Sequence, residues 1–113
     1  MIQIYGIKNC DSVKKALKFF KEHQLEYALF DFKKEPLPCS KIDEWLQKTT
    51  IDKLFNSRST TYRTLKLKEL NLDESGKKEW LCKENLLIKR PVVEFEDKLL
   101  VGFNEEEYKR TFL

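Results

Sequence analysis

The sequence predicts an α/β fold: a four-stranded mixed sheet, with helices inserted between a strand–helix–strand half and a strand–strand–helix half. Near the start of the chain, two strand-like apolar runs flank a pattern with helical spacing, over residues 1–32. Near the end, residues 92–101 carry two more short apolar runs joined by a tight turn. The residues between these halves carry mainly helical patterns, so the order of the patterns indicates the fold class.

The first half begins with a short apolar run containing Ile2, Ile4 and Tyr5, which predicts a strand buried on both faces. A helical period then extends from about Asp11 to His23. Residues 27–32 alternate and carry aromatic side chains, which predicts a second strand. Two strands joined by a helix are expected to lie parallel, with a right-handed crossover.

The middle of the chain predicts helices of modest length. Ser40, with Asp43 three residues later, resembles a capping box at the start of a helix. Residues 49–72 have poorer periodicity and predict short helical pieces. Ser75 is expected to cap a further helix that ends near Lys83.

The last part of the chain predicts a hairpin followed by a helix. Pro91 precedes an apolar strand at residues 92–95, which a tight turn joins to a strand at residues 99–101. Asn104 is a suitable N-cap for the final helix. The complete order is that of a thioredoxin-like fold with a helical insertion, and we expect a single domain over residues 1–113.

The composition limits the classes of function. The chain has 113 residues, of which 41% are hydrophobic and 36% charged, as in a folded domain with a well-solvated surface. A net charge of +3 is too weak to indicate nucleic-acid binding. No apolar run is long enough to cross a bilayer, and no secretory signal pattern is present, so a cytoplasmic location is expected.

The cysteines predict free thiols. Cys10, Cys39 and Cys82 are odd in number and widely spaced, which does not suit a disulfide framework. The chain has one histidine, His23, and no CxxC or HxxxH pattern. A metal site would therefore lack ligands, and none is expected.

Cys10 is the candidate nucleophile because it lies between the first strand and the first helix. The unpaired N–H groups and the positive end of the helix dipole favour a thiolate there, and the thiolate is the nucleophile. Lys8 and Lys14 act in the same direction, whereas Asp11 opposes it. The alternative is that Cys10 is a small buried apolar residue, as many cysteines are.

The segment from Tyr5 to Ala16, YGIKNCDSVKKA, resembles the N-terminal motif of the arsenate reductase (ArsC)/Spx/YffB family, most closely its YffB-like branch. The similarity continues in order along almost the whole chain. The further matching blocks are Asp31, Trp45-Leu46, residues 56–62, residues 88–93 and residues 101–104.

This resemblance implies a thioredoxin-like fold in which Cys10 works with glutathione or another thiol as co-substrate, without a bound cofactor. It also implies a cis bond between Arg90 and Pro91 beside the thiol, a bond for which cis is accessible. The residues expected to bind substrate or glutathione are Asn9, Ser12, Arg58, Arg90 and Pro91. Ser12 has capping of the helix as an alternative role, and Arg58 and Arg90 have pairing with surface acids.

Two departures from the family pattern bear on the reaction. Arsenate reductases use three arginines around the cysteine, of which Arg90 matches one directly. Arg58 is displaced by two positions, with Asn56 at the aligned place, and residues 101–104 contain no arginine. A tetrahedral dianion needs several charge-assisted donors, so arsenate is disfavoured as the substrate.

The second departure is Val13, which stands where the Spx branch often has a second cysteine. Without a local CxxC, we expect a mixed disulfide on Cys10 that an external thiol or a glutaredoxin- or thioredoxin-type protein resolves. Cys39 or Cys82 would serve instead only with Cα atoms within about 7 Å of Cys10. The alternative function is an Spx-like regulator that binds the RNA polymerase α subunit. Nothing in the sequence requires more than a monomer.

Overall fold

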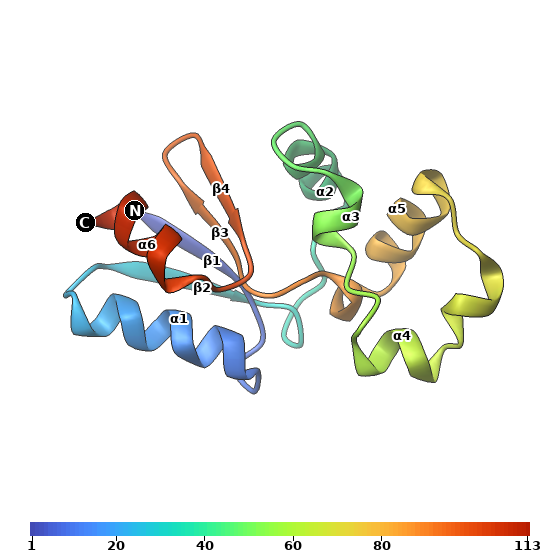
Figure 1. The fold of residues 1–113 in the computed structure, drawn as a ribbon, viewed down its shortest axis with the longest axis horizontal. Helices are drawn as coiled ribbons and strands as arrows, with labels where there is room; N and C mark the ends of the chain where they lie inside the picture. Colours follow the sequence, from blue (N-terminus) through green and yellow to red (C-terminus); the bar gives the residue numbers. More distant parts are fainter. The chain divides into compact units, whose positions relative to one another are not determined.

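The computed structural model describes residues 1–113 and divides into two compact units (Figure 1). The sheet unit comprises Met1–Asp31 with Arg90–Leu113, and the helical unit comprises Phe32–Lys89. The expectation of a single domain over residues 1–113 stays a prediction.

The sheet unit contains a four-stranded mixed sheet, as predicted, and its strand order is β2-β1-β3-β4. Strand β1 is parallel to β2 and antiparallel to β3, and β3 is antiparallel to β4. This is the thioredoxin-like arrangement. The elements of the unit are β1 (Ile2–Gly6), α1 (Asp11–Glu22), β2 (Tyr27–Asp31), β3 (Val92–Phe95), β4 (Lys98–Val101) and α6 (Glu105–Phe112).

Aromatic side chains of α1 and α6 form the core of the sheet unit. The ring of Phe20 stacks on that of Tyr108, with centroids 5.6 Å apart, and both side chains are fully buried. Tyr108 donates a hydrogen bond from its hydroxyl to the carbonyl of Gly102 at 3.1 Å. Burial, assisted by the charge of Glu107, raises the pKa of Tyr108. Because Ile4 and Val93 of the sheet belong to the same cluster, α1 and α6 cover one face of the sheet.

The two helices of the sheet unit have well-defined ends. Helix α1 ends in a Schellman motif in which the N–H of Leu25 bonds to the carbonyl of Phe20 at 2.9 Å. Gln24 takes the left-handed conformation that this motif requires, with φ 56°. Asn104 caps α6, as predicted, and its side chain accepts from the N–H of Glu107 at 3.0 Å.

The helical unit consists of short helices, as expected for its poorer periodicity. Phe55 and Ile88 form an isolated antiparallel bridge between its segments. Its elements are α2 (Cys39–Leu46), α3 (Ile51–Leu54), α4 (Thr60–Thr64), η1 (Leu67–Leu70), α5 (Glu74–Lys83) and η2 (Asn85–Leu87). Its buried apolar side chains are Phe32, Leu37, Ile42, Trp45, Ile51, Leu54, Phe55, Leu67, Leu81, Leu87 and Ile88. None of the helices in either unit is both long and apolar enough to cross a membrane.

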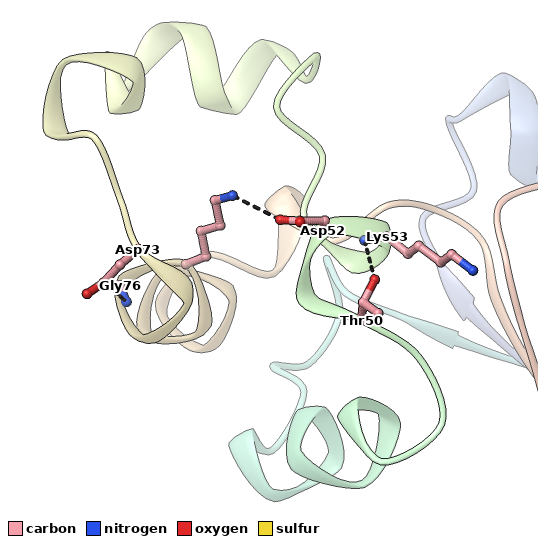
Figure 2. Close-up of polar contacts among 6 residues, drawn as sticks. Thr50, Asp52, Lys53, Asp73 and Gly76 are labelled. Atoms are coloured by element: carbon pink, nitrogen blue, oxygen red, sulfur yellow. Dashed lines mark hydrogen bonds and ion pairs between the residues drawn. The ribbon is translucent and has the colours of Figure 1, made fainter.

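Two predicted caps in the helical unit are wrong. Helix α2 begins at Cys39 with Pro38 at the N-cap, so Ser40 lies inside the helix. Helix α5 is capped by Asp73, whose carboxylate accepts from the N–H of Gly76 at 2.8 Å, and Ser75 lies in the first turn (Figure 2). Aspartate and serine are equally good N-caps, so residue type alone did not distinguish the two positions.

The prediction of three free thiols is also wrong. Cys39 and Cys82 form a disulfide within the helical unit, with their Cα atoms 5.1 Å apart. Cys10 is the free cysteine. The two bonded residues are separated by 43 positions, and only the packing of the start of α2 near the end of α5 brings them together.

Candidate functional site

Cys10 lies at the junction of β1 and α1, where the sequence predicted it. It is the N-cap residue of α1, with an extended backbone at φ −141° and ψ 126°. Its carbonyl accepts the first helical hydrogen bond, from the N–H of Lys14 at 2.9 Å. The Cys10 thiol makes no capping hydrogen bond, and the residue is half-buried. The sulfur is therefore at the positive end of a twelve-residue helix without being sealed in the core.

The strand register places the Arg90–Pro91 segment at the same end of β1. Tyr5 of β1 pairs with Val92 of β3. Because these strands are antiparallel, Pro91, which precedes Val92, lies beside Gly6, where the chain leaves β1 toward Cys10. The Arg90–Pro91 bond is cis, as the resemblance implied. Pro91 is buried, and its carbonyl accepts from the N–H of Gly102 at 2.8 Å. Arg90 is half-buried.

Gly6 allows the close approach of three segments at this point. A Cβ at position 6 would lie 2.8 Å from Cγ2 of Val13 and 3.9 Å from the Cβ of Arg90. Residue 6 thus touches both the first turn of α1 and the segment before β3. The segment that carries Cys10 and the segment that carries Arg90 therefore meet at Gly6, within the sheet unit.

The other two candidates in the sheet unit flank Cys10. Asn9 is exposed in the turn before Cys10, and Ser12 is half-buried in the first turn of α1. Ser12 does not cap the helix, because Cys10 holds the N-cap position. The first turn also carries the exposed Lys14.

Arg58 belongs to the helical unit, whereas Cys10 belongs to the sheet unit. It is exposed, and its N–H donates to the Oδ1 atom of Asn56 at 3.1 Å. The carbonyl of Arg58 accepts from the guanidinium of Arg63 at 3.2 Å. Asn56, which the resemblance aligned with a family arginine, supports a local turn that leads to Ser59, the N-cap of α4.

Sequence reasoning missed the pairing of Cys39 with Cys82, and no local signal reveals it. Each cysteine is isolated in the sequence, and helix-to-helix packing cannot be deduced from periodicity alone. No group of three His, Cys, Asp or Glu side chains is placed to hold a metal ion.

The sheet unit, with a cysteine at the start of its first helix and a cis-proline before β3, defines a protein of the thioredoxin-like class. The chain belongs to the ArsC family, whose model matches residues 5–111.

Individual relatives cover almost the whole chain. An uncharacterised protein of Haemophilus influenzae is 42% identical over 113 residues, which is 99% of each chain. The global transcriptional regulator Spx of Listeria innocua is 31% identical and covers 97% of this chain and 86% of its own. The solved structure of the YffB protein is 31% identical, with a TM-score of 0.92 and complete coverage of both chains. The family thus includes proteins named as regulators, and the family alone does not identify the activity.

Proposed function

We propose that the protein is a thiol-dependent reductase whose reaction uses a single nucleophilic cysteine, Cys10. The observation that carries this proposal is the half-buried Cys10 thiol at the N-terminal end of α1. A thiol at the start of a helix and outside the core is accessible to an external disulfide, and a cysteine attacks disulfides in its thiolate form. We expect this chemistry to take place in the cytoplasm, where small thiols keep such a cysteine reduced.

The proposed reaction proceeds through a mixed disulfide. The Cys10 thiolate attacks one sulfur of a substrate disulfide, which forms a bond to Cys10 and releases the other sulfur as a thiolate. A small thiol, most simply glutathione, then attacks the substrate sulfur and releases Cys10 as a thiolate. A glutaredoxin- or thioredoxin-type protein is the alternative reductant. The fully buried Val13 occupies the position of a CxxC partner, so the resolving thiol comes from outside this motif.

Glutathione is an anion, and the surroundings of Cys10 suit one. The guanidinium of Arg90 can hold a carboxylate through two parallel hydrogen bonds, and the backbone of Pro91 offers a main-chain contact. Asn9 and Ser12 contribute polar side chains on either side of Cys10. We propose the same binding role for Arg58, for which the support is the family resemblance alone.

Arsenate reduction, with glutathione or glutaredoxin as reductant, is the alternative within this class. Asn56 supports a turn rather than supplying a guanidinium, and residues 101–104 contain no arginine. Fewer charge-assisted donors would then compensate the lost hydration of the oxyanion. We therefore expect disulfide substrates to be turned over much faster than arsenate.

The second candidate function is an Spx-like regulator that binds the RNA polymerase α subunit. The observation in its favour is the Listeria innocua regulator, which matches 97% of this chain. The test is a pull-down with the purified C-terminal domain of that subunit. A stoichiometric complex, together with no thiol-transfer activity, would favour the regulator over the enzyme.

The reductase is tested with glutathione and a small mixed disulfide as substrates. The double variant Cys39→Ser/Cys82→Ser leaves Cys10 as the only sulfur nucleophile and is expected to remain active. Adding Cys10→Ser to it should reduce the rate to that of glutathione and the disulfide alone. An equal rate with and without the Cys10 sulfur would disprove the proposal.

A second measurement addresses the binding residues. In a glutathione titration followed by NMR, shifts are expected at Asn9, Cys10, Ser12 and Arg90. Arg90→Lys keeps the charge but loses the planar fork, so it should raise KM for glutathione more than it lowers kcat. An unchanged KM would remove Arg90 from the proposed site.

A further inference from the structure

We propose that Cys39 and Cys82 form a second redox site, a dithiol–disulfide couple that exchanges with low-molecular-weight disulfides such as glutathione disulfide. The couple lies wholly in the helical unit, whereas Cys10 belongs to the sheet unit. It needs no contribution from Cys10, and it stands whether or not Cys10 is a catalytic nucleophile.

The fold places Cys39 and Cys82 close enough to form and re-form a disulfide. Their Cα atoms are 5.1 Å apart, within the range that allows a bond to form without movement of the backbone. Cys39 is the first residue of α2, and Cys82 is the penultimate residue of α5. The same two helices that bury the core of this unit therefore hold the sulfurs at bonding distance.

The two cysteines differ in their exposure to external thiols and disulfides. Cys39 is exposed, whereas Cys82 is half-buried. Thiol–disulfide exchange requires an in-line approach to one sulfur, so an external thiol or disulfide reaches Cys39 more readily. This asymmetry assigns Cys39 as the sulfur that reacts with external partners and Cys82 as the sulfur that resolves the mixed disulfide.

Contacts other than the disulfide also hold α2 against α5. The N–H of Leu37, two residues before Cys39, donates to the Oδ1 atom of Asn85 at 2.9 Å. The side chain of Asn85 also donates to the carbonyl of Leu81 at 2.9 Å. Asp43 of α2 forms an ion pair with Lys78 of α5. These contacts keep the two thiols close after reduction, so the bond can form again.

The helical unit also has room for an anionic thiol ligand. A pocket of about 510 Å³ is lined by residues 32–36 and 83–86, and its lining includes Lys83, which follows Cys82 directly. Three lysines and two glutamates lie along it, so its charged side chains have a net positive balance. Glutathione disulfide carries a net negative charge and fits this balance.

The proposed oxidation proceeds in two exchange steps. The Cys39 thiolate attacks glutathione disulfide, which forms a bond from Cys39 to one glutathione and releases the other as a thiolate. The Cys82 thiolate then attacks the sulfur of Cys39 and releases the second glutathione. The protein loses two electrons and two protons, and glutathione disulfide becomes two glutathione molecules. Reduction is the reverse sequence with two glutathione molecules.

The test uses the full-length Cys10→Ser variant, which removes the third thiol and places a good capping residue at the start of α1. The protein is equilibrated in mixtures of reduced and oxidised glutathione, quenched with acid, alkylated and weighed by mass spectrometry. The ratio of dithiol to disulfide should follow the square of reduced glutathione divided by oxidised glutathione. Hydrogen exchange in the α2 amides should be faster in the reduced form.

Either of two results would overturn the couple. Both thiols could stay open to alkylation even in oxidised glutathione alone, in which case no disulfide forms by exchange. Alternatively, the disulfide could persist in reduced glutathione alone, in which case it is a fixed structural bond. Because Cys10 is absent from this experiment, neither result bears on the proposed reductase.

The assignment of the two sulfurs is tested with single variants in the same Cys10→Ser background. Cys82→Ser should accumulate one glutathione on Cys39, because the resolving sulfur is missing. Cys39→Ser should form its adduct on Cys82 more slowly, because that residue is half-buried. Tryptophan fluorescence checks that both variants are folded. Equal rates, or a faster reaction at Cys82, would contradict the assignment.

Discussion

The sheet unit and the helical unit are stabilised in different ways. In the sheet unit, four strands pair through the backbone, and the aromatic residues of α1 and α6 form one continuous cluster. In the helical unit, helices of three to ten residues depend on caps, scattered ion pairs and one disulfide. The comparison indicates that the sheet unit derives its stability from burial, whereas the helical unit adds covalent and polar links to a smaller number of aromatic contacts.

The largest expected effect comes from Phe20→Ala in the sheet unit. Phe20 of α1 is fully buried and packs against Tyr108 and Phe112 of α6. The cavity and the lost burial should therefore lower the free energy of unfolding by about 3–5 kcal/mol. The measurement is urea unfolding followed by far-UV circular dichroism. A loss below about 1 kcal/mol would contradict the dependence of this unit on burial.

Both tryptophans, Trp45 and Trp80, lie in the helical unit, so fluorescence reports on that unit alone. In Phe20→Ala, amide NMR signals of β1 and tryptophan fluorescence can be compared along the same urea series. Coincident transitions would mean that the two units unfold together, and separate transitions would mean that each unfolds by itself.

The next effect is reduction of the Cys39–Cys82 disulfide. In the chain-entropy model, a closed loop of 43 residues contributes about 4 kcal/mol, and measured values are commonly about 2–4 kcal/mol. Reduction should therefore lower the urea midpoint detected by tryptophan fluorescence. The matched control is Cys39→Ser/Cys82→Ser, whose midpoint should not respond to reductant. An unchanged midpoint on reduction of the unmodified protein would contradict the contrast between the units.

Tyr108→Phe has a smaller effect with a distinct pH signature. Removing the hydroxyl leaves the carbonyl of Gly102 without this donor, which should cost about 1 kcal/mol near neutral pH. The raised pKa of Tyr108 also means that the unfolded chain loses its phenolic proton first. The contribution of Tyr108 to the free energy of unfolding should therefore be constant below about pH 10 and should fall as the pH rises further.

The check is urea unfolding of the unmodified protein and Tyr108→Phe between neutral and strongly alkaline pH. The difference in stability between the two should narrow above about pH 10, because only the unmodified protein carries this linkage. A constant difference across the range would mean that Tyr108 titrates alike in the folded and unfolded chain.

The smallest effects come from side-chain caps, of which Asp73 in the helical unit and Asn104 in the sheet unit are compared. Asp73→Ala removes the acceptor for Gly76, and Asn104→Ala removes the acceptor for Glu107, so each should cost about 1 kcal/mol. Asp73→Asn and Asn104→Asp are the conservative controls, which retain a capping oxygen. If the control were as unstable as the alanine variant in urea, the cap would not be the cause.

Much of the sheet unit could be predicted from the sequence, because its patterns are local and repeat regularly. The alternation near Ile4 and the helical period ending in the buried Phe20 each indicate one element. The position of Cys10 follows from the boundary between them. The cis bond at Pro91 came only from the family resemblance, since no pattern of residue types distinguishes it from the trans form.

The helical unit was predicted less well, for physical reasons that differ from one position to another. The choice of Asp73 over Ser75 as the cap depended on where the chain turns, since both residue types cap well. The link between Cys39 and Cys82 depends on the packing of α2 near α5, which the spacing of apolar residues does not reveal. The role of Asn56 in a turn depends on the position of the N–H group of Arg58, which the residue type alone does not reveal.

The absence of a side chain at Gly6 affects how Cys10 is positioned. Even one methyl group there would collide with Val13, so it would act as a wedge under the opening turn of α1. Lifting that turn would carry the thiol away from the strand end and from the guanidinium-bearing segment together. Gly6 therefore determines how closely the first turn of α1, and with it Cys10, approaches the end of β1.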